Sequence, residues 1–292
     1  MSASERSSPR AVTAVGASAA RRELSMNQAT VPRWRASEVI EGCARAGYAG
    51  VGLWRDRVQE EGPAKLARLA RQAGVQVTSL CRGGFFLAPA PEEAKARMDD
   101  NRRAVDEAAM LGAPVLALVC GPAPDRDLAG ARKAVAAAIA ELASYAAPAG
   151  VALGIEPLHP LYCGDRSVVV TLAQALSIAR STGTGRTGVV LDSYHLWWDP
   201  DLESDIAAAQ DDILLVQLAD WLAPPPDPLN GRGMLGDGCI DLRGFCRSVR
   251  SAGYAGPLEV EIFNPDVWAL EPARALEVVA RRYEEHVASS SL

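Results

Sequence analysis

The stretch Gly150–Pro160, with the sequence GVALGIEPLHP, decides how the rest of the chain is interpreted. Its apolar run Val151–Ile155 is typical of a short buried strand, and the carboxylate of Glu156 follows it directly. A carboxylate at the tip of a buried strand is unfavourable unless a cation or hydrogen-bond donors compensate it. Glu156 is therefore the first candidate for a functional residue.

Three further apolar runs downstream end in a side chain that carries an oxygen ligand. Taken alone, a strand-terminal glutamate is more often a salt-bridge residue than a metal ligand. Four such residues at successive strand ends instead favour one shared site. The runs and their terminal residues are Thr187–Leu191 with Asp192, Ile213–Val216 with Gln217, and Leu258–Val260 with Glu261.

From residue 23 onward, short apolar runs alternate with segments whose apolar residues recur at helical spacing. Eight such units predict an α/β fold, a single-domain (β/α)8 TIM barrel over residues 23–292. Catalytic residues of such barrels lie at the C-terminal ends of the strands, where the four oxygen-bearing residues fall. The predicted strands are 24–28, 49–54, 75–80, 114–120, 151–155, 187–191, 213–216 and 258–260, and the predicted helices are 37–46, 65–73, 91–111, 128–147, 168–181, 202–210, 242–252 and 272–287.

Composition narrows the class of protein. The first 22 residues are rich in Ser, Ala and Arg and lack the apolar core of a secretory signal, so we predict a disordered N-terminal extension over residues 1–22. Six cysteines at no paired spacing indicate reduced thiols and a cytoplasmic protein. A net charge of −6 disfavours a nucleic-acid partner, and no apolar run is long enough for a membrane span. A small molecule is the expected partner, and a homo-oligomer stays open.

The four strand-end residues predict metal chemistry. Three carboxylates and one amide oxygen form an oxygen-only ligand set, which favours one Mn²⁺ or Mg²⁺ ion over zinc. Such a site stays net negative and suits a neutral polyol or hydroxy-ketone, whose carbonyl group the ion would polarise. Glu156 and Glu261 are the natural pair to move a proton next to that carbonyl, by way of an enediolate. Glu259 lies on the same face of its strand and is expected deeper in the barrel.

Other side chains just beyond the strand ends are candidates for substrate contacts. His159 and His195 could contact substrate or orient ligands, although each could equally be a hydrogen-bonded loop histidine. Aromatic residues there, Trp54 and Trp198 among them, could line a sugar pocket or simply pack the loops. The long loop 221–238, crowded with Pro and Gly, is typical of a functional lid. Three arginines on the same rim could bind a carboxylate or phosphate, or be solvated surface: Arg55, Arg82 and Arg232.

With these residues in hand, the chain resembles the xylose isomerase-like barrel family of sugar isomerases and epimerases over about residues 24–283. The resemblance implies a divalent metal held by Glu156, Asp192, Gln217 and Glu261, with the two glutamates exchanging protons with substrate. Arg232 lies where epimerase relatives have a loop arginine that contacts substrate. The segments that carry the resemblance are LGIEPLHP, VLDSYHLWW, VQLADW, GDGCID and AGYAGPLEVEIF.

Within that family, Gln217 is informative. Ketose 3-epimerases have His at this position, whereas hydroxypyruvate isomerase is similar to this chain in having Gln, together with an Asp-x-Tyr-His segment like that at Asp192. The leading hypothesis is a metal-dependent isomerase or epimerase of a small sugar, keto-sugar or hydroxy-ketone. The runner-up is β-elimination from a keto-sugar, as in members that resemble inosose dehydratase or cleave C-glycosides. A third hypothesis is a sugar-binding subunit without turnover.

Overall fold

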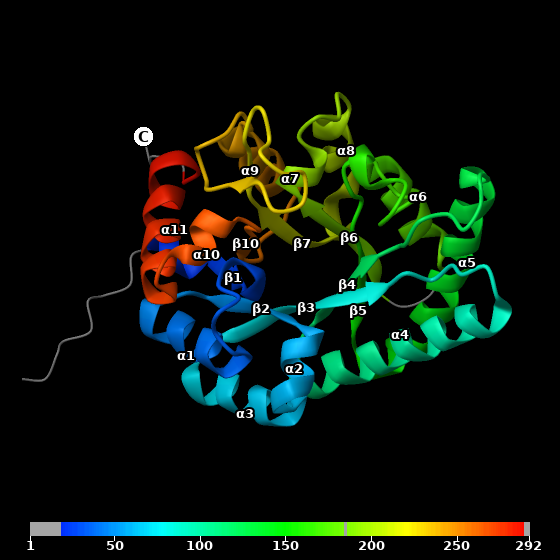
Figure 1. Cartoon of the computed structure of the whole chain (residues 1–292), viewed down its shortest axis with the longest axis horizontal. Helices are drawn as coiled ribbons and strands as arrows, with labels where there is room; N and C mark the ends of the chain where they lie inside the picture. The colour runs from blue at the N-terminus through cyan, green and yellow to red at the C-terminus, as the bar shows by residue number, and fades with distance from the viewer. Residues whose placement is uncertain (1–18, 184–185, 289–292) are drawn as a thin grey trace, which may run out of the picture.

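A computed structural model of the chain describes residues 19–183 and 186–288. Its centre is a closed parallel barrel with the neighbour order β1-β10-β7-β6-β5-β4-β3-β2, which confirms the predicted (β/α)8 barrel. Figure 1 shows helices around the outside of these strands. The barrel strands are β1 Leu24–Asn27, β2 Gly50–Trp54, β3 Gln76–Gly84, β4 Val115–Val119, β5 Ala152–Ile155, β6 Thr187–Asp192, β7 Ile213–Leu218 and β10 Leu258–Val260.

The helices end where the sequence supplies residues that tolerate a left-handed backbone. Gly47, Gly74 and Gly112 follow α1, α3 and α4 with φ angles of 79°, 70° and 79°, at which a side chain would be strained. The helices are α1 Ala36–Ala46, α2 Arg55–Glu61, α3 Pro63–Ala73, α4 Pro91–Leu111, α5 Leu128–Ala146, α6 Leu172–Ser181, α7 Ser193–Leu196, α8 Leu202–Ala209, α9 Leu242–Ser251, α10 Pro265–Ala269 and α11 Pro272–His286.

Two apolar layers hold the barrel together. The larger lies between the strands and the surrounding helices, and includes the fully buried Leu24, Leu118 and Val260. A smaller cluster inside the barrel includes Val115 and Val190. Each fully buried side chain of this size contributes about 1.5–3 kcal/mol to the free energy of unfolding. The apolar strand tips are therefore rigid supports for the polar residues that follow them.

Strand register brings polar residues of three adjacent strands side by side at one end of the barrel. Asp192 on β6 pairs with Gln217 on β7, and Gln217 in turn pairs with Glu259 on β10. The backbone N–H groups of Glu156 and Glu261 donate to Leu118 O and Leu218 O, so both glutamates continue the barrel's hydrogen-bond ladder just beyond their strands. The C-terminal end of the barrel thus fixes all four predicted strand-end residues through backbone bonds.

The structure adds the short helices α2, α7 and α10 to the predicted elements, and α6 begins at Leu172 instead of residue 168. Three further differences concern β3, the loop after β7 and the start of the chain. Strand β3 runs on to Gly84, four residues beyond the predicted end, because it pairs with β4 past a register shift. The loop after β7 holds a two-stranded antiparallel sheet, β8 Asp220–Trp221 and β9 Arg232–Gly233. The predicted extension 1–22 lies outside the described residues up to residue 18, whereas Ala19–Glu23 form a 3-10 helix.

Two composition-based predictions can be compared with the described part of the chain. All six cysteines are free, and Cys43, Cys81, Cys120 and Cys246 are buried, as expected for thiols that pack as small apolar residues. None of the described helices is long and apolar enough to cross a membrane.

Candidate active site

A cavity of about 450 Å³ opens at the C-terminal end of the barrel. Its wall includes six of the residues singled out from the sequence: Trp54, Arg82, Glu156, His195, Arg232 and Glu261. They come from β2 and β3, from the segments after β5, β6 and β10, and from β9, so separate parts of the sequence converge on this one hollow. A larger hollow of about 920 Å³ lies beside α8 and α9 and has none of these residues in its wall.

Asp192 is oriented by the start of a short helix. One carboxylate oxygen accepts a hydrogen bond from the backbone N–H of Tyr194 at 2.9 Å, which caps α7. Its other oxygen, Oδ2, is left to face the site, where Arg232 Nη1 lies 2.8 Å away. Asp192 is fully buried, so both oxygens depend on these protein donors.

Two glutamates on β10 and just after it occupy different environments. Glu259 is fully buried and accepts four hydrogen bonds from neutral side chains. Glu261 lines the cavity, and its Oε2 lies 3.2 Å from Arg232 Nη1. The donors to Glu259 are Asn27 at 2.7 Å, Gln217 at 2.9 Å, Thr78 at 2.8 Å and Ser79 at 2.9 Å.

Arg232 reaches the site because Asp220 organises its loop. The Asp220 carboxylate accepts hydrogen bonds from the backbone N–H groups of Trp221, Gly236, Gly238 and Ile240 at 2.8–3.0 Å. A Cβ at residue 238 would lie 2.2 Å from the Trp221 carbonyl oxygen, so only glycine fits that turn. The loop predicted as a lid is therefore fastened down over the site.

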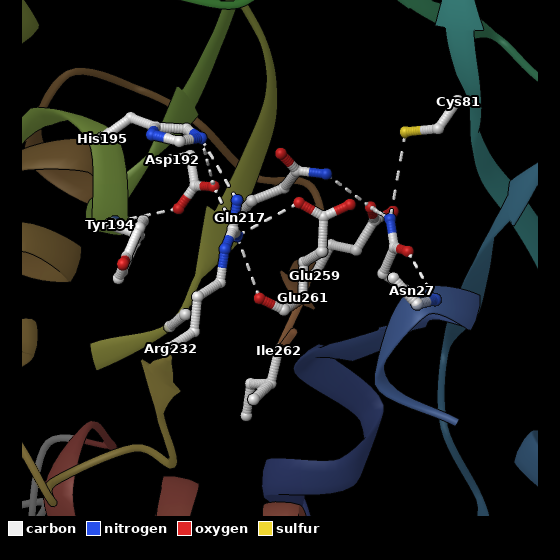
Figure 2. A network of polar contacts seen from close by, with 12 residues as sticks. Asn27, Cys81, Asp192, Tyr194, His195, Gln217, Arg232, Glu259, Glu261 and Ile262 are labelled. Atoms are coloured by element: carbon white, nitrogen blue, oxygen red, sulfur yellow. Dashed lines mark hydrogen bonds and ion pairs between the residues drawn. The ribbon is translucent and has the colours of Figure 1, made fainter. Parts of the chain in front are cut away.

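The guanidinium group of Arg232 occupies the middle of the acidic cluster (Figure 2). Nη1 forms ion pairs with Asp192 and Glu261, and Nη2 lies 3.1 Å from His195 Nε2. The rings of Tyr194 and Phe263 lie 4.8 Å and 5.0 Å from the guanidinium carbon. The chain thus places a cation of its own where three carboxylates converge, a contact that the strand-end pattern did not predict.

The other two candidates for substrate contact, His159 and Trp198, both contact His195. His159 donates its backbone N–H to His195 Nδ1 at 3.3 Å, and its ring stacks on Trp221. Trp198 donates its indole N–H to the His195 carbonyl oxygen and contacts His159 edge to face. Neither ring is among the described residues that line the cavity, so substrate contact by His159 and Trp198 stays a prediction.

Burial controls the protonation of the cluster. It raises the pKa of Glu156 to about 8, with the charge of Asp192 acting in the same direction and Arg232 opposing it. Burial also raises the pKa of Glu261 well above its usual range, again against the effect of Arg232. The pKa of His195 is lowered well below its usual value, first by burial and then by Arg232. Without a further cation, burial therefore favours the protonated forms of Glu156 and Glu261, and the charge of Arg232 alone does not reverse this.

The donor set fits a divalent cation in two respects. Side-chain ligand atoms of Glu156, Asp192 and His195 all lie within 4.8 Å of one another, as a shared ion requires. The amide oxygen of Gln217 is buried and has no hydrogen-bond partner, while its Nε2 is held by Glu259. A buried carbonyl oxygen without a donor is unfavourable unless a cation or water satisfies it. His195 is a potential ligand that the strand-end pattern missed, because it lies one turn into α7.

The chain belongs to the family described as the xylose isomerase-like TIM barrel, whose sequence model matches residues 40–283. Among curated proteins, 3-dehydroshikimate dehydratase of Pseudomonas aeruginosa is 31% identical over 247 residues, which are 82% of this chain and 37% of the dehydratase. Inosose isomerase of Halalkalibacterium halodurans is 28% identical over 143 residues, 48% of this chain and 49% of the isomerase. The chain therefore spans well under two thirds of these enzymes.

Solved structures share the barrel fold. A protein from Sinorhizobium meliloti 1021 superimposes with a TM-score of 0.88 at 43% identity, covering 91% of this chain and 99% of that chain. The IolI protein, solved with a bound zinc atom, gives a TM-score of 0.78 at 20% identity over 91% of this chain and 98% of that chain. The second likeness shows the shared fold alone.

Proposed function

We propose that the protein is a divalent-metal-dependent enzyme that removes a proton next to the carbonyl group of a small polyhydroxylated ketone. The observation that carries this proposal is the convergence of three buried carboxylates, Glu156, Asp192 and Glu261, on one position that already attracts the Arg232 cation. Curated relatives that modify an inosose and 3-dehydroshikimate support an enzyme acting on such a compound.

Glu156, Asp192, Gln217 and Glu261 would hold the ion, with His195 within reach of two of them. An oxygen-rich set of this kind favours Mn²⁺ or Mg²⁺. When bound, the ion would polarise the substrate carbonyl and lower the pKa of the adjacent C–H and hydroxyl groups.

The chain's own residues then carry the proton. β5 and β10 lie on either side of β6 and β7 in the barrel, so Glu156 and Glu261 flank Asp192 and Gln217. One glutamate accepts the proton from the carbon next to the carbonyl, and the other returns a proton. Return to the neighbouring carbon yields an isomer, and return to the opposite face of the same carbon yields an epimer. The Trp54 ring, which lines the same cavity, supplies an apolar face for the C–H groups of the substrate.

Elimination is the second candidate, and the match to 3-dehydroshikimate dehydratase favours it. The first step is the same proton abstraction. A hydroxyl group on the next carbon then leaves as water instead of the carbon being reprotonated, so that C–H and C–O bonds break and a C=C bond forms. A carbon-linked aglycone could leave by the same route in place of a hydroxyl group.

Proton NMR in D₂O separates these outcomes. The manganese- or magnesium-loaded protein would be incubated with inosose, D-fructose and 3-dehydroshikimate, each beside the Glu156→Gln variant. Deuterium incorporation with recovery of an isomer supports the first candidate, and loss of water supports the second. If no ketone exchanges a proton while one binds, the protein is a sugar-binding subunit and the proposal is wrong.

A further inference from the structure

An arginine of the cavity wall has no acidic partner in the part of the chain that the structure describes. Arg82 lies at the register shift between β3 and β4, where Cys81 pairs with Ala117 and Gly83 already pairs with Leu118. Arg82 is therefore the extra residue of a β-bulge, a device that redirects a side chain out of the strand's normal alternation. Its side chain lines the cavity that also holds Glu156 and Glu261.

Neighbouring arginines of this rim are neutralised by the protein. Arg55 forms ion pairs with Asp100 at 2.9 Å and Glu107 at 2.7 Å. Arg57 lies 3.4 Å from Glu60. For Arg82, the structure gives instead a contact with the Phe85 ring, whose centre lies 4.3 Å from the guanidinium carbon. Its five N–H donors are thus left for something other than a carboxylate of the described chain.

A second arginine lies on the same side of the cavity. Arg166 follows β5 in the chain, and its backbone carbonyl accepts a hydrogen bond from Gly121 N–H at 2.8 Å, which fixes the loop. Its side chain is 35% exposed, and the acid near it, its chain neighbour Asp165, is a solvent-exposed group 3.6 Å away. Burial lowers the pKa of Arg82 and the charge of Arg166 acts in the same direction, whereas Cys81 and Glu156 oppose them. Two cations at one hollow, neither of which forms an ion pair with a buried acid of the described chain, are unfavourable unless an anion joins them.

We propose that Arg82 and Arg166 form a subsite for an oxyanion, a carboxylate or phosphate group of the substrate, whose hydroxy-ketone part lies against Glu156 and Glu261. This inference deepens the proposed function and rests on it. A planar guanidinium group matches a carboxylate or phosphate through paired N–H donors. A volume of about 450 Å³ suits a compound of one ring or a short chain. The substrate class is then a small acidic hydroxy-ketone or a phosphorylated one, in place of the neutral polyol expected from the carboxylates alone.

The test compares charged ligands with neutral partners of nearly the same shape. Calorimetric titration of the manganese-loaded full chain would use 3-dehydroshikimate and its primary carboxamide as the carboxylate pair, and D-fructose 6-phosphate and D-fructose as the phosphate pair. The variants are Arg82→Gln and the less buried Arg166→Gln. Arg57→Gln is the matched control, because Arg57 lines the same cavity but is paired with Glu60.

We expect wild-type protein to bind the charged member of one pair at least about tenfold more tightly than its neutral partner. Arg82→Gln should reduce that preference by about 10- to 100-fold, and Arg57→Gln should leave it within about threefold. The pair that shows the preference identifies the oxyanion as carboxylate or phosphate. Equal binding of charged and neutral members by wild type, or an unchanged preference in both Arg82→Gln and Arg166→Gln, overturns the subsite.

The same samples keep this inference apart from the proposed function. If inosose or D-fructose exchanges its proton with D₂O while neither arginine variant changes the preference for an anion, the enzyme assignment stands and the subsite is wrong. If an anion binds with the expected dependence on Arg82 but no ketone exchanges a proton, the subsite stands and the enzyme assignment fails.

Discussion

Glu259 and Glu261 lie two residues apart at the end of one strand, yet the protein treats their carboxylates in opposite ways. Glu259 is surrounded by neutral donors from β1, β3 and β7 and is sealed from solvent. Glu261 lies at the cavity, faces the guanidinium of Arg232, and has a raised pKa. Glu259 marks a lower level of the barrel end, which is built for stability because its acceptors are satisfied. Glu156 and Glu261 at the cavity mark an upper level, which is built for binding a cation.

The largest expected effect lies at the upper level. Glu156→Gln and Glu261→Gln should each lower kcat about 10³-fold, because the substituted amide cannot take a proton from substrate. Solvent deuterium incorporation, followed by NMR on whichever ketone the wild type turns over, measures this. Glu277→Gln, on the exposed face of α11, is the control and should keep wild-type kcat. Full activity in Glu261→Gln would remove the distinction between the two levels.

Glu259→Gln should show the reverse pattern. Its amide presents one acceptor and one NH₂ group to four donors, so about two hydrogen bonds are lost. The free energy of unfolding, measured by urea titration, should fall by about 2–4 kcal/mol. The kcat of the folded fraction should fall less than about tenfold, because Glu259 does not line the cavity among the described residues. Unchanged stability together with lost turnover would contradict this assignment.

The sequence predicted the features that depend on the backbone pattern better than those that depend on side-chain direction. The apolar runs predicted the barrel and the strand ends because both depend on periodicity, which a single sequence carries. Glu156 and Asp192 were found for that reason, since Glu156 directly follows β5 and Asp192 is the last residue of β6. The roles of these residues as ligands and bases stay predictions.

What periodicity does not encode is the direction of side chains in loops and bulges. The guanidinium of Arg232 enters the acidic cluster through a loop folded around Asp220, and nothing in the spacing of that loop predicts this contact. Arg166 was not singled out, because the segment after β5 has no periodic pattern. Arg82 was named only as one of three rim arginines, and the ion pairs of Arg55 were needed to set it apart.

The free energy of unfolding of the ion-free protein should depend on pH because Glu156, at the upper level, titrates differently in the folded and unfolded states. In the folded chain the pKa of Glu156 is raised to about 8 from an ordinary value of 4.5. Below pH 4.5 both folded and unfolded states hold this proton, so its contribution to stability is fully present. Between pH 4.5 and about 8 only the unfolded state releases it, so stability falls as the pH rises.

Glu156→Gln should flatten that decline by on the order of 2 kcal/mol. Urea unfolding in EDTA across this pH range measures it, and Glu277→Gln should keep the wild-type slope. An identical slope in Glu156→Gln would show that Glu156 is not the buried acid responsible.

The smallest expected effect is the change in Mn²⁺ affinity when Arg232 is replaced. Its guanidinium lies within 3.2 Å of Asp192 and Glu261, so it repels any second cation there. Arg232→Gln should therefore raise the affinity for Mn²⁺ at least about tenfold. Calorimetry measures the change, with Arg247→Gln on the exposed surface of α9 as control. Weaker Mn²⁺ binding in Arg232→Gln would mean that the arginine supports the ion rather than competing with it.

The central claim is that Glu156, Asp192, Gln217 and Glu261 share one divalent cation, and a Mn²⁺ titration of metal-free protein followed by electron paramagnetic resonance tests it directly. The account predicts about one bound ion per chain and a dissociation constant at least about 100-fold larger in Asp192→Asn. No bound Mn²⁺ in the wild type, or equal affinity in Asp192→Asn, would contradict it.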